Sequence, residues 1–406
     1  MSTPGFDPGR EERFLRLNFY EDWDMRITLR RRAMIVLAVS CLASGWMSQV
    51  AQAVGKKKAP APPVVKASDW LVSPELLDHA RLKIVWQAML PIRPGEGYDT
   101  IALLGDRLLI RSDRNYMWSL DAAKGTVAFS RSMALENIPV VGLIGYGDSL
   151  ISVVGNRLAE YNTATGAEQR VLDPGLGIVG MPARNSQFFY LAAADRRLHA
   201  FRANDMVRVF QAAAENDSLI TTVLADENMV IFGTSEGDVM AIAADAPRKL
   251  WEFKAPEAVA GSIVRDGDSL YFACKDTNVY RLDMTESSQP RMAWKFQTEA
   301  VLTGSPLVTD GYVYQYAPGR SLTAINKQTG QAAWSLAEGL DLLAEGGGKA
   351  YVITRVRTLA VMDNATGKKL YSVNCAAVTG HASNTKSARI YVMDEHGRVA
   401  CLEPIQ

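Results

Sequence analysis

Short apolar runs separated by turn residues follow one another along most of the chain. From Asp99 onward, each run is rich in Val, Leu and Tyr, and Gly or Asp stands at its ends. Short runs with β-branched and aromatic residues between turn signals are typical of β-strands rather than helices. The pattern therefore predicts an all-β chain of many short strands.

The strand pattern returns about every 40 residues, which is the length of a four-stranded propeller blade. A β-sandwich also alternates apolar and polar positions, but turns and aromatic residues that recur in phase favour a closed ring. We therefore predict an eight-bladed β-propeller of four-stranded antiparallel blades. We interpret eight residues as equivalent places in its blades: Leu109, Leu150, Tyr190, Val230, Tyr271, Tyr314, Tyr351 and Tyr391.

The sixth blade shows the repeat most clearly. Its predicted middle strands lead into an eleven-residue motif that runs from Ala324 to Trp334. Gly330 allows the positive φ of a turn within the motif, and we expect Trp334 to pack against a neighbour. Other copies keep the spacing but change the residues: Arg170 replaces the tryptophan in blade two, and blade three, around residues 200–210, has lost the glycine.

The eighth repeat, whose motif opens at Ala400, lacks the final strand and aromatic residue of the other blades. An open edge would leave backbone donors and acceptors unpaired. The strand-like run 82–90 carries Trp86 and can supply the missing piece. We predict that this N-terminal strand becomes the outer strand of the blade built by residues 385–403 and closes the ring, with Trp86 in the role of Trp334.

The motif resembles the tryptophan-docking repeat of pyrroloquinoline quinone (PQQ) dehydrogenases and of their non-enzymatic relatives, which include the outer-membrane assembly propeller BamB. The resemblance covers residues 80–406 and implies the propeller fold. It says little about function, because functional sites vary on a shared fold. No contact residue is carried over, since the motif defines the scaffold and not its binding loops.

The N-terminal residues have the form of an export signal. Arg30–Arg32 precede the apolar run 33–47, and a small-x-small cleavage site ends at Ala53. The run is shorter than the roughly 20 residues of a membrane span. We therefore expect residues 1–53 to be a targeting segment whose true start is Met25, with an uncleaved anchor as the alternative.

Cys41 offers a second way of processing. Residues Leu37–Cys41 loosely resemble a lipoprotein processing box, although Ala38 stands where Leu is usual. Residues 54–67 are rich in Lys, Pro and Ala and predict a solvated linker before a propeller of residues 68–406. The protein is thus expected to be exported and periplasmic or outer-membrane-associated, with membrane association only if Cys41 is lipidated.

Charge and composition exclude several kinds of partner. Lys plus Arg and Asp plus Glu each number 44, so no basic field is present to hold a nucleic acid. The four histidines form no metal-ligand spacing, and we interpret them as ordinary surface or strand residues: His79, His199, His381 and His396. Neither a nucleic-acid partner nor a bound metal is expected.

No catalytic or cofactor-binding residue is predicted. The resemblance to quinoprotein dehydrogenases implies an adjacent cysteine pair over the cofactor, and this chain has none. Cys274 and Cys401 are interpreted as core residues, and a disulfide between Cys375 and Cys401 is the alternative for an oxidising compartment. Most carboxylates fall in turns or recur in the motif, which favours a structural role: Asp106, Asp148, Asp226, Asp268 and Asp310, and in the motif Asp121, Asp283 and Asp363.

The sequence therefore predicts a non-enzymatic exported scaffold that binds protein partners, among them a candidate component of outer-membrane protein assembly. Its functional site is expected to be a surface of loops and exposed blade edges rather than a pocket. One alternative is a quinoprotein that holds PQQ as a redox cofactor at the propeller axis. Another is a surface propeller with an unrelated partner.

The export signal predicts the mass of the mature protein. Cleavage after Ala53 leaves Val54 as the first residue, and the lipoprotein route instead leaves a lipidated Cys41. Intact-mass measurement of protein recovered from the periplasm and from membranes distinguishes the two. A product that keeps residues 25–47 and carries no lipid would contradict both.

Overall fold

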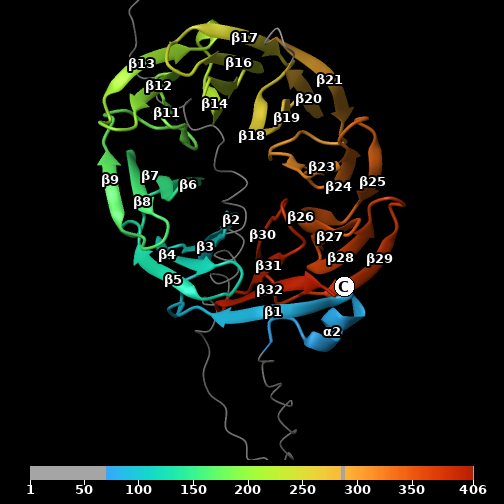
Figure 1. Cartoon of the computed structure of the whole chain (residues 1–406). Helices are drawn as coiled ribbons and strands as arrows, with labels where there is room; N and C mark the ends of the chain where they lie inside the picture. Colours follow the sequence, from blue (N-terminus) through green and yellow to red (C-terminus); the bar gives the residue numbers. More distant parts are fainter. Residues whose placement is uncertain (1–69, 285–288, 406) are drawn as a thin grey trace, which may run out of the picture. The chain divides into compact units, whose positions relative to one another are not determined.

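Eight sheets of four antiparallel strands stand around a ring in this computed structural model, as Figure 1 shows. The structure describes residues 70–284 and 289–405. The predicted eight-bladed propeller is therefore confirmed. The predicted targeting segment 1–53 and linker 54–67 lie outside the described residues.

The first four blades are formed by consecutive strands. Blade one consists of β2 (Tyr98–Leu104), β3 (Arg107–Ser112), β4 (Tyr116–Asp121) and β5 (Val127–Ser132), and blade two of β6 (Val140–Tyr146), β7 (Ser149–Val154), β8 (Arg157–Asn162) and β9 (Glu168–Leu172). Blade three consists of β10 (Ala183–Arg184), β11 (Phe188–Ala192), β12 (Arg197–Arg202) and β13 (Arg208–Ala213), and blade four of β14 (Ile220–Ala225), β15 (Met229–Thr234), β16 (Asp238–Ala243) and β17 (Lys249–Lys254). A short 3-10 turn, η2 (Glu215–Asp217), joins blades three and four.

The next three blades follow the same order, and the eighth combines both ends of the chain. Blade five consists of β18 (Val259–Asp266), β19 (Ser269–Cys274), β20 (Asn278–Met284) and β21 (Pro290–Gln297), and blade six of β22 (Leu307–Val308), β23 (Tyr312–Ala317), β24 (Ser321–Asn326) and β25 (Ala332–Leu336). Blade seven consists of β26 (Gly339–Gly346), β27 (Lys349–Thr354), β28 (Thr358–Asp363) and β29 (Lys369–Asn374). Blade eight consists of β30 (Gly380–Ala382), β31 (Ile390–Met393), β32 (Arg398–Pro404) and β1 (Leu82–Met89), which follows helix α2 (Pro74–His79).

The hydrophobic core lies between neighbouring blades. Tyr190 of blade three and Phe232 of blade four, for example, are both fully buried in one cluster. Each blade buries both faces of its two middle strands, which explains why those strands are nearly continuous apolar runs. Burial of both faces, rather than of one, is what a ring of stacked sheets requires.

The up-and-down order of the strands divides the turns between two faces of the ring. The turns that follow the first and third strands of a blade meet on one face, where they bond to each other, as from Ala122 N to Asp106 O at 2.9 Å. The turns that follow the second strands lie on the other face with the connections between blades. We call these the hairpin face and the connection face.

At four of the eight seams, the motif joins one blade to the next through an aromatic ring that lies on a glycine: Trp86 on Gly125, Phe129 on Gly166, Trp294 on Gly330 and Trp334 on Gly367. Trp294 of blade five covers Gly330 of blade six, and a Cβ atom at that glycine would collide with the indole. The indole Nε1 of Trp294 also donates to the carbonyl of Lys327 at 3.0 Å. Gly330 has φ +71°, so a side chain there would be strained as well as crowded. The predicted packing of the motif's aromatic residue against a neighbour is confirmed.

In blade two, an arginine side chain takes the place of the tryptophan and donates to the equivalent backbone carbonyl of the next blade. Arg170 donates from Nη1 to the carbonyl of Ala203, which is the motif position that Lys327 holds in blade six. Its Nε donates to the buried Glu160 at 2.9 Å, and Arg184 holds the second carboxylate oxygen. Burial raises the pKa of Glu160, but hydrogen bonds from Ser149 and both arginines outweigh it and leave the pKa below its usual value.

The ring is closed by the N-terminal strand, as predicted. β1 pairs with β32 along its length, and Trp86 stands opposite Cys401 just as Trp334 stands opposite Ala324. Trp86 lies over Gly125 of blade one, and its Nε1 donates to Ala122 O at 3.1 Å. The chain then continues from β1 into β2, so β1 links the last blade covalently to the first.

Three of the residues taken from the sequence as equivalent are wrong by one position. The strand partners of the motif show that Ile151 and Ile231, not Leu150 and Val230, correspond to Tyr314. For the same reason the motif of blade eight opens at Cys401 and not at Ala400. Where consecutive residues of a middle strand are all buried, the apolar pattern does not distinguish the two faces.

Opening the ring should cost far more stability than shortening the linker. Deleting residues 54–90 removes β1 and leaves the edge of β32 unpaired, whereas deleting residues 54–67 leaves the blade intact. Trp86→Ala, a milder change, should lower the free energy of unfolding by about 3 kcal/mol in urea titrations. Trp70→Ala, at a half-exposed indole outside the strands, is the control and should have a smaller effect. Equal melting temperatures for the two deletions would show that the ring closes in another way.

Candidate functional site

Among the described turns and connections, most of the exposed large apolar side chains lie on the connection face, while others lie along the outer strands of the blades. Five lie in the turns and connections of this face: Leu135, Ile138, Met181, Val301 and Val356. Leu135 is 81% exposed, more than any other large apolar residue of the described chain. Among the described turns of the hairpin face, Val207 alone is comparably exposed. The five residues come from four connections or turns around the ring, and of these the pair Leu135 and Ile138 shares one loop, which makes that loop the candidate binding surface.

A buried polar side chain fixes the backbone of the loop that carries Leu135 and Ile138. Asn115, which is 4% exposed, donates from Nδ2 to Leu135 O at 2.9 Å and to Ile138 O at 2.8 Å. Arg111 in turn donates to Asn115 Oδ1 at 2.9 Å and pairs with Asp99. The two exposed side chains are therefore presented by a fixed backbone, which lowers the entropy that binding has to overcome.

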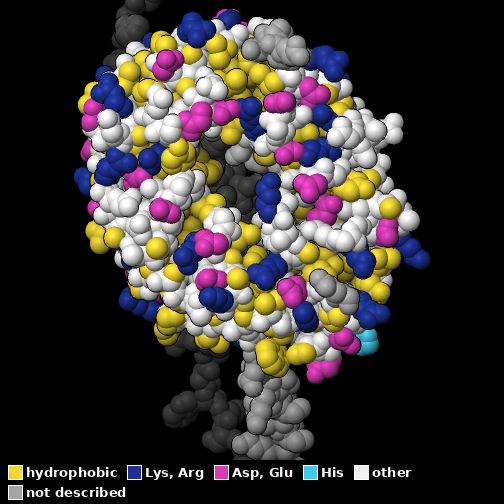
Figure 2. Space-filling view, in the orientation of Figure 1, with side chains coloured by type: hydrophobic (Ala, Val, Ile, Leu, Met, Phe, Trp, Pro, Cys, Tyr) yellow, Lys and Arg dark blue, Asp and Glu magenta, His cyan; other side chains and the backbone are white. Residues whose placement is uncertain are grey.

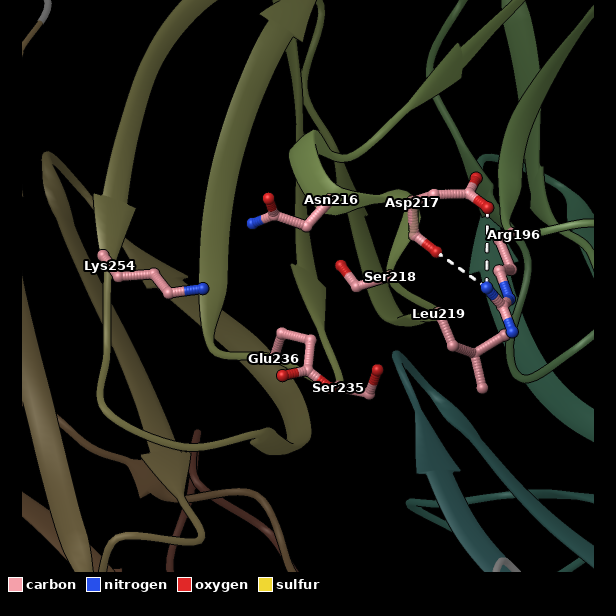
Figure 3. A pocket seen from close by; sticks show the side chains of 8 residues that line it. All are labelled: Arg196, Asn216, Asp217, Ser218, Leu219, Ser235, Glu236 and Lys254. Atoms are coloured by element: carbon pink, nitrogen blue, oxygen red, sulfur yellow. Dashed lines mark hydrogen bonds and ion pairs between the residues drawn. The ribbon is translucent and has the colours of Figure 1, made fainter.

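A pocket of about 410 Å³ opens on the same face between blades three and four. It is formed by the turn after β11, the connection that contains η2, the turn after β15 and the end of β17. Figure 3 shows Lys254 extending toward the middle of the group from one side, while Arg196 and Asp217 meet on the other. Its lining residues are Arg196, Asn216, Asp217, Ser218, Leu219, Ser235, Glu236 and Lys254.

The pocket presents charges of both signs. Arg196 Nη1 lies 3.5 Å from Asp217 Oδ2 and donates to Asp217 O at 3.3 Å. Lys254 Nζ lies 2.6 Å from Oδ1 of the buried Asp238, whose other oxygen accepts from Thr234 Oγ1 at 3.0 Å. The Lys254 side chain is half-exposed, so its ammonium is fixed in place while it remains accessible.

Left-handed backbone is frequent around this pocket. Arg196 has φ +65°, Asn216 φ +63° and Asp217 φ +51°. Residues other than glycine rarely adopt this region, although Asn and Asp tolerate it best. Such conformations persist only where the surroundings enforce them, and they are frequent at binding sites.

A second, smaller hollow of about 280 Å³ lies on the hairpin face of blade three. It is lined by Ser186, Gln187, Phe188, Arg202 and Asn204. Glu227 of blade four stands beside it, because its carboxylate accepts from the Ser186 backbone N–H at 3.1 Å. Blade three therefore has a hollow on each face.

Two of the three motif carboxylates bond to the backbone, and the third pairs with an arginine. In the motif, Asp121 and Asp363 each accept two backbone N–H groups of the following turn. Asp283 differs, because its carboxylate pairs with Arg281 Nε at 2.7 Å and accepts from Ser269 Oγ. Asp106, Asp148, Asp226, Asp268 and Asp310 lie at the turns after first strands of blades, as predicted.

The three described cysteines are free, so the alternative of a Cys375–Cys401 disulfide is wrong. Cys375 lies in the cluster between blades seven and eight, whereas Cys401 faces blade one from the other side of its sheet. Burial raises the pKa of Cys375 to about 11 and that of both Cys274 and Cys401 to about 12. These thiols stay protonated at neutral pH and behave as core residues.

Two of the four histidines lie in strands and make polar contacts. His199 in β12 is buried, with Nε2 2.9 Å from Asp195 Oδ2, and His381 Nε2 in β30 lies 2.8 Å from Asp341 Oδ2. His79 ends helix α2, and His396 lies in the turn before β32. Within residues 70–284 and 289–405, no group of three or more His, Cys, Asp or Glu is arranged to hold a metal ion.

Charge is mixed over the surface. Figure 2 shows Lys and Arg intermingled with Asp and Glu across the visible face of the ring. In the part of the chain that the structure describes, no helix has the length and apolar character to cross a membrane. Binding by this surface therefore depends on local side-chain pairs and apolar contacts rather than on a long-range field of one sign.

The sequence did not reveal the pocket, because its residues come from four separate segments. The run Glu215–Asp217 carried a signal, since adjacent Asn and Asp residues in a connection favour left-handed backbone. Leu135 carried another, since it precedes the polar pair Glu136 and Asn137 in a connection between two strand-like runs. Neither signal identifies a site until the fold brings the segments together.

Fold and repeat together define an eight-bladed propeller of the PQQ-repeat class. A family model described as outer membrane protein assembly factor BamB matches residues 75–289 and 264–346. The matched region is more than half of the chain, and the protein belongs to this family. No curated protein matches the chain.

Solved structures agree with this fold. BamB from Moraxella catarrhalis matches with a TM-score of 0.61 at 17% identity, over 79% of this chain and 97% of that one. The computationally designed Ika8 protein matches with a TM-score of 0.58 at 15% identity, over 77% of this chain and 98% of that one. The C-terminal WD40 domain of Sif2 matches with a TM-score of 0.57 at 12% identity, over 79% and 98%. Identities this low show similarity of fold alone.

The motif carboxylates should prove structural when they are replaced. Asp363→Ala removes the acceptor of two turn N–H groups and should lower the melting temperature by a few degrees at pH 7. Asp363→Asn should have less effect, because Asn326 accepts the same bonds in blade six.

The same hydrogen bonds to Asp363 make the stability of the fold depend on pH. The backbone N–H of Thr366, foremost among several donors, lowers the pKa of Asp363. The stability that ionised Asp363 contributes is therefore fully present above the pKa of this carboxyl in the unfolded chain, about 4. That stability is lost as the pH falls through the lower pKa of the folded protein. The difference between wild type and Asp363→Ala should shrink in thermal melts over that range. Loss of partner binding at an unchanged melting temperature would instead indicate a functional role.

Proposed function

We propose that this protein is an exported, non-enzymatic scaffold that holds a protein partner on its connection face and works in the assembly of outer-membrane proteins. The observation that carries the proposal is the asymmetry between the faces. Among the turns and connections that the structure describes, five exposed large apolar side chains and the larger pocket lie on the connection face, whereas one such residue and the smaller hollow lie on the hairpin face.

The chemistry of this face suits a folded protein more than a small molecule. Leu135 and Ile138 offer apolar contact on a loop that Asn115 holds in place. Lys254, Arg196 and Glu236, which line the pocket between blades three and four on the same face, offer charges of both signs for specificity. Protein interfaces usually combine apolar contacts with charged groups.

Export supports the same role, since the chain carries a sequence of signal-peptide form and belongs to a family described as an outer-membrane assembly factor. The absence of catalysis is supported by the environment of the candidate groups. The motif carboxylates bond to turn backbone or to arginine, and the described thiols are buried and protonated. Activated nucleophiles and bases instead need perturbed, accessible groups gathered at one place.

The proposal is tested by photocrosslinking in the native bacterium. A photoreactive residue at Leu135 should capture one major protein, identified by mass spectrometry, and the same residue at Lys124, exposed on the hairpin face, should not. The purified captured protein should bind wild type, and Leu135→Lys should weaken binding at least ten-fold, because a charge replaces an apolar contact. Deletion of the gene should lower outer-membrane β-barrel protein levels, and Leu135→Lys should fail to restore them.

Two results would contradict the proposal. Equal capture of the same proteins from Leu135 and Lys124 would show that the connection face has no special role. Stoichiometric binding of PQQ with Ca²⁺, seen in the absorbance spectrum and accompanied by dye reduction, would favour a redox protein instead.

A further inference from the structure

Blade three departs from the other blades in several ways. Met206, at φ +61°, stands at the position that glycine holds in the complete motifs. Phe210 replaces the tryptophan and is only half-buried, whereas Trp251, Trp294 and Trp334 are buried. The outer part of this blade is therefore less firmly docked on its neighbour than the corresponding parts of blades four, five and six.

The outer strand of blade three, β13, has a free edge. β13 pairs with β12 on one side, and no strand among the described residues pairs with the other side. Its exposed residues after Arg208 are Val209, Gln211 and Ala213, and Val207 precedes it. Val209 is the extra residue of a bulge opposite Ala200 and Phe201. Backbone N–H and C=O groups on such an edge are available to an added strand.

Outer strands differ in charge, and β29, like β13, carries a charge only at its first position, Lys369. β17 carries Lys249, Glu252 and Lys254, and β21 carries Arg291 and Lys295. β25 has no charged residue, but it exposes only alanine and serine. In β13 the only charge is Arg208 at its first position, and the exposed residues after it are neutral. Charged side chains on an edge prevent strand addition, and their absence permits it.

A hollow lies on each face of the ring near blade three. Asn204, which lines the smaller hollow, comes four residues before β13 begins, and Asn216, which lines the larger pocket, comes three residues after it ends. A strand rises about 3.3 Å per residue, so an extended segment of about eight residues would span β13 itself.

We infer that the free edge of β13 binds an extended, uncharged, aliphatic segment of a partner polypeptide as a fifth strand of blade three. Alternate side chains of the added strand lie against Val207 and Val209, and its backbone bonds to the edge of β13. A charged segment is disfavoured, because the exposed face offers aliphatic groups and no opposite charge after Arg208. This inference rests on the proposed scaffold function and specifies the partner's chemistry.

The test uses a defined probe with the full mature protein. A fluorescent, capped peptide of eight alternating Val and Thr residues is titrated with protein, and binding is followed by fluorescence anisotropy. The same peptide with alternate backbone amides N-methylated cannot form strand hydrogen bonds. We expect the first peptide to bind and the methylated peptide to bind at least ten-fold more weakly.

Two lysine variants locate the binding edge. Val209→Lys should weaken binding of the probe at least ten-fold, because it puts a charge on the edge. Ala293→Lys is the matched control, since Ala293 precedes Trp294 in β21 as Val209 precedes Phe210 in β13, and both residues are exposed. In the wild-type protein, hydrogen exchange of the β13 amides should slow on addition of the probe, and that of the β21 amides should not. Because this measurement uses the wild-type protein, its result does not depend on whether a variant folds.

Equal binding of the two peptides, equal weakening by the two lysine variants, or unchanged exchange in β13 at saturating probe would overturn the inference. So would failure of the unmethylated peptide to bind at millimolar concentration. Loss of the Leu135 crosslink with the peptide result intact would instead overturn the proposed docking face. The two proposals can therefore fail separately.

Discussion

The structure depends on the docking of each blade on the next through its outer strand, and at four of the eight seams this docking places an aromatic ring on a glycine. The contact requires a bare glycine backbone, a left-handed turn and a carbonyl directed at the indole, and Trp294 with Gly330 meets all three conditions. Because the blades form a ring, every seam has to fit at once. The last seam is made by Trp86 on Gly125, so it forms only when β1 has been incorporated beside β32.

Much of this could be predicted from the sequence, because the docking contact needs particular residues at fixed spacing. Gly330 and Trp334 are recognisable by type, and the surplus strand with Trp86 indicated how the ring closes. The exact register of blades two and four could not be predicted, because their middle strands are buried on both faces and adjacent aliphatic residues look alike. Substitutions such as Arg170 for tryptophan became interpretable only when its acceptor, Ala203 O, was located.

The binding surface could not be predicted, for a different physical reason. Its groups come from turns far apart in sequence, and their meaning lies in their placement on one face of the ring. The hairpin face is cross-linked between blades by pairs such as Asp226 with Arg265 and Lys327 with Asp266. Those bonds use polar groups for stability and leave the connection face to carry the exposed aliphatic residues. Under the proposed function, stability and recognition are thus divided between the two faces of the ring.

The central claim is that a rigid ring recognises a protein through its connection face. Hydrogen exchange of the full mature protein, measured with and without the partner captured through Leu135, tests this most directly. The account predicts slower exchange in the connections 133–139, 173–182 and 214–219, with little change in the turns of the hairpin face. Slower exchange confined to the hairpin face, or spread evenly around the ring, would contradict it.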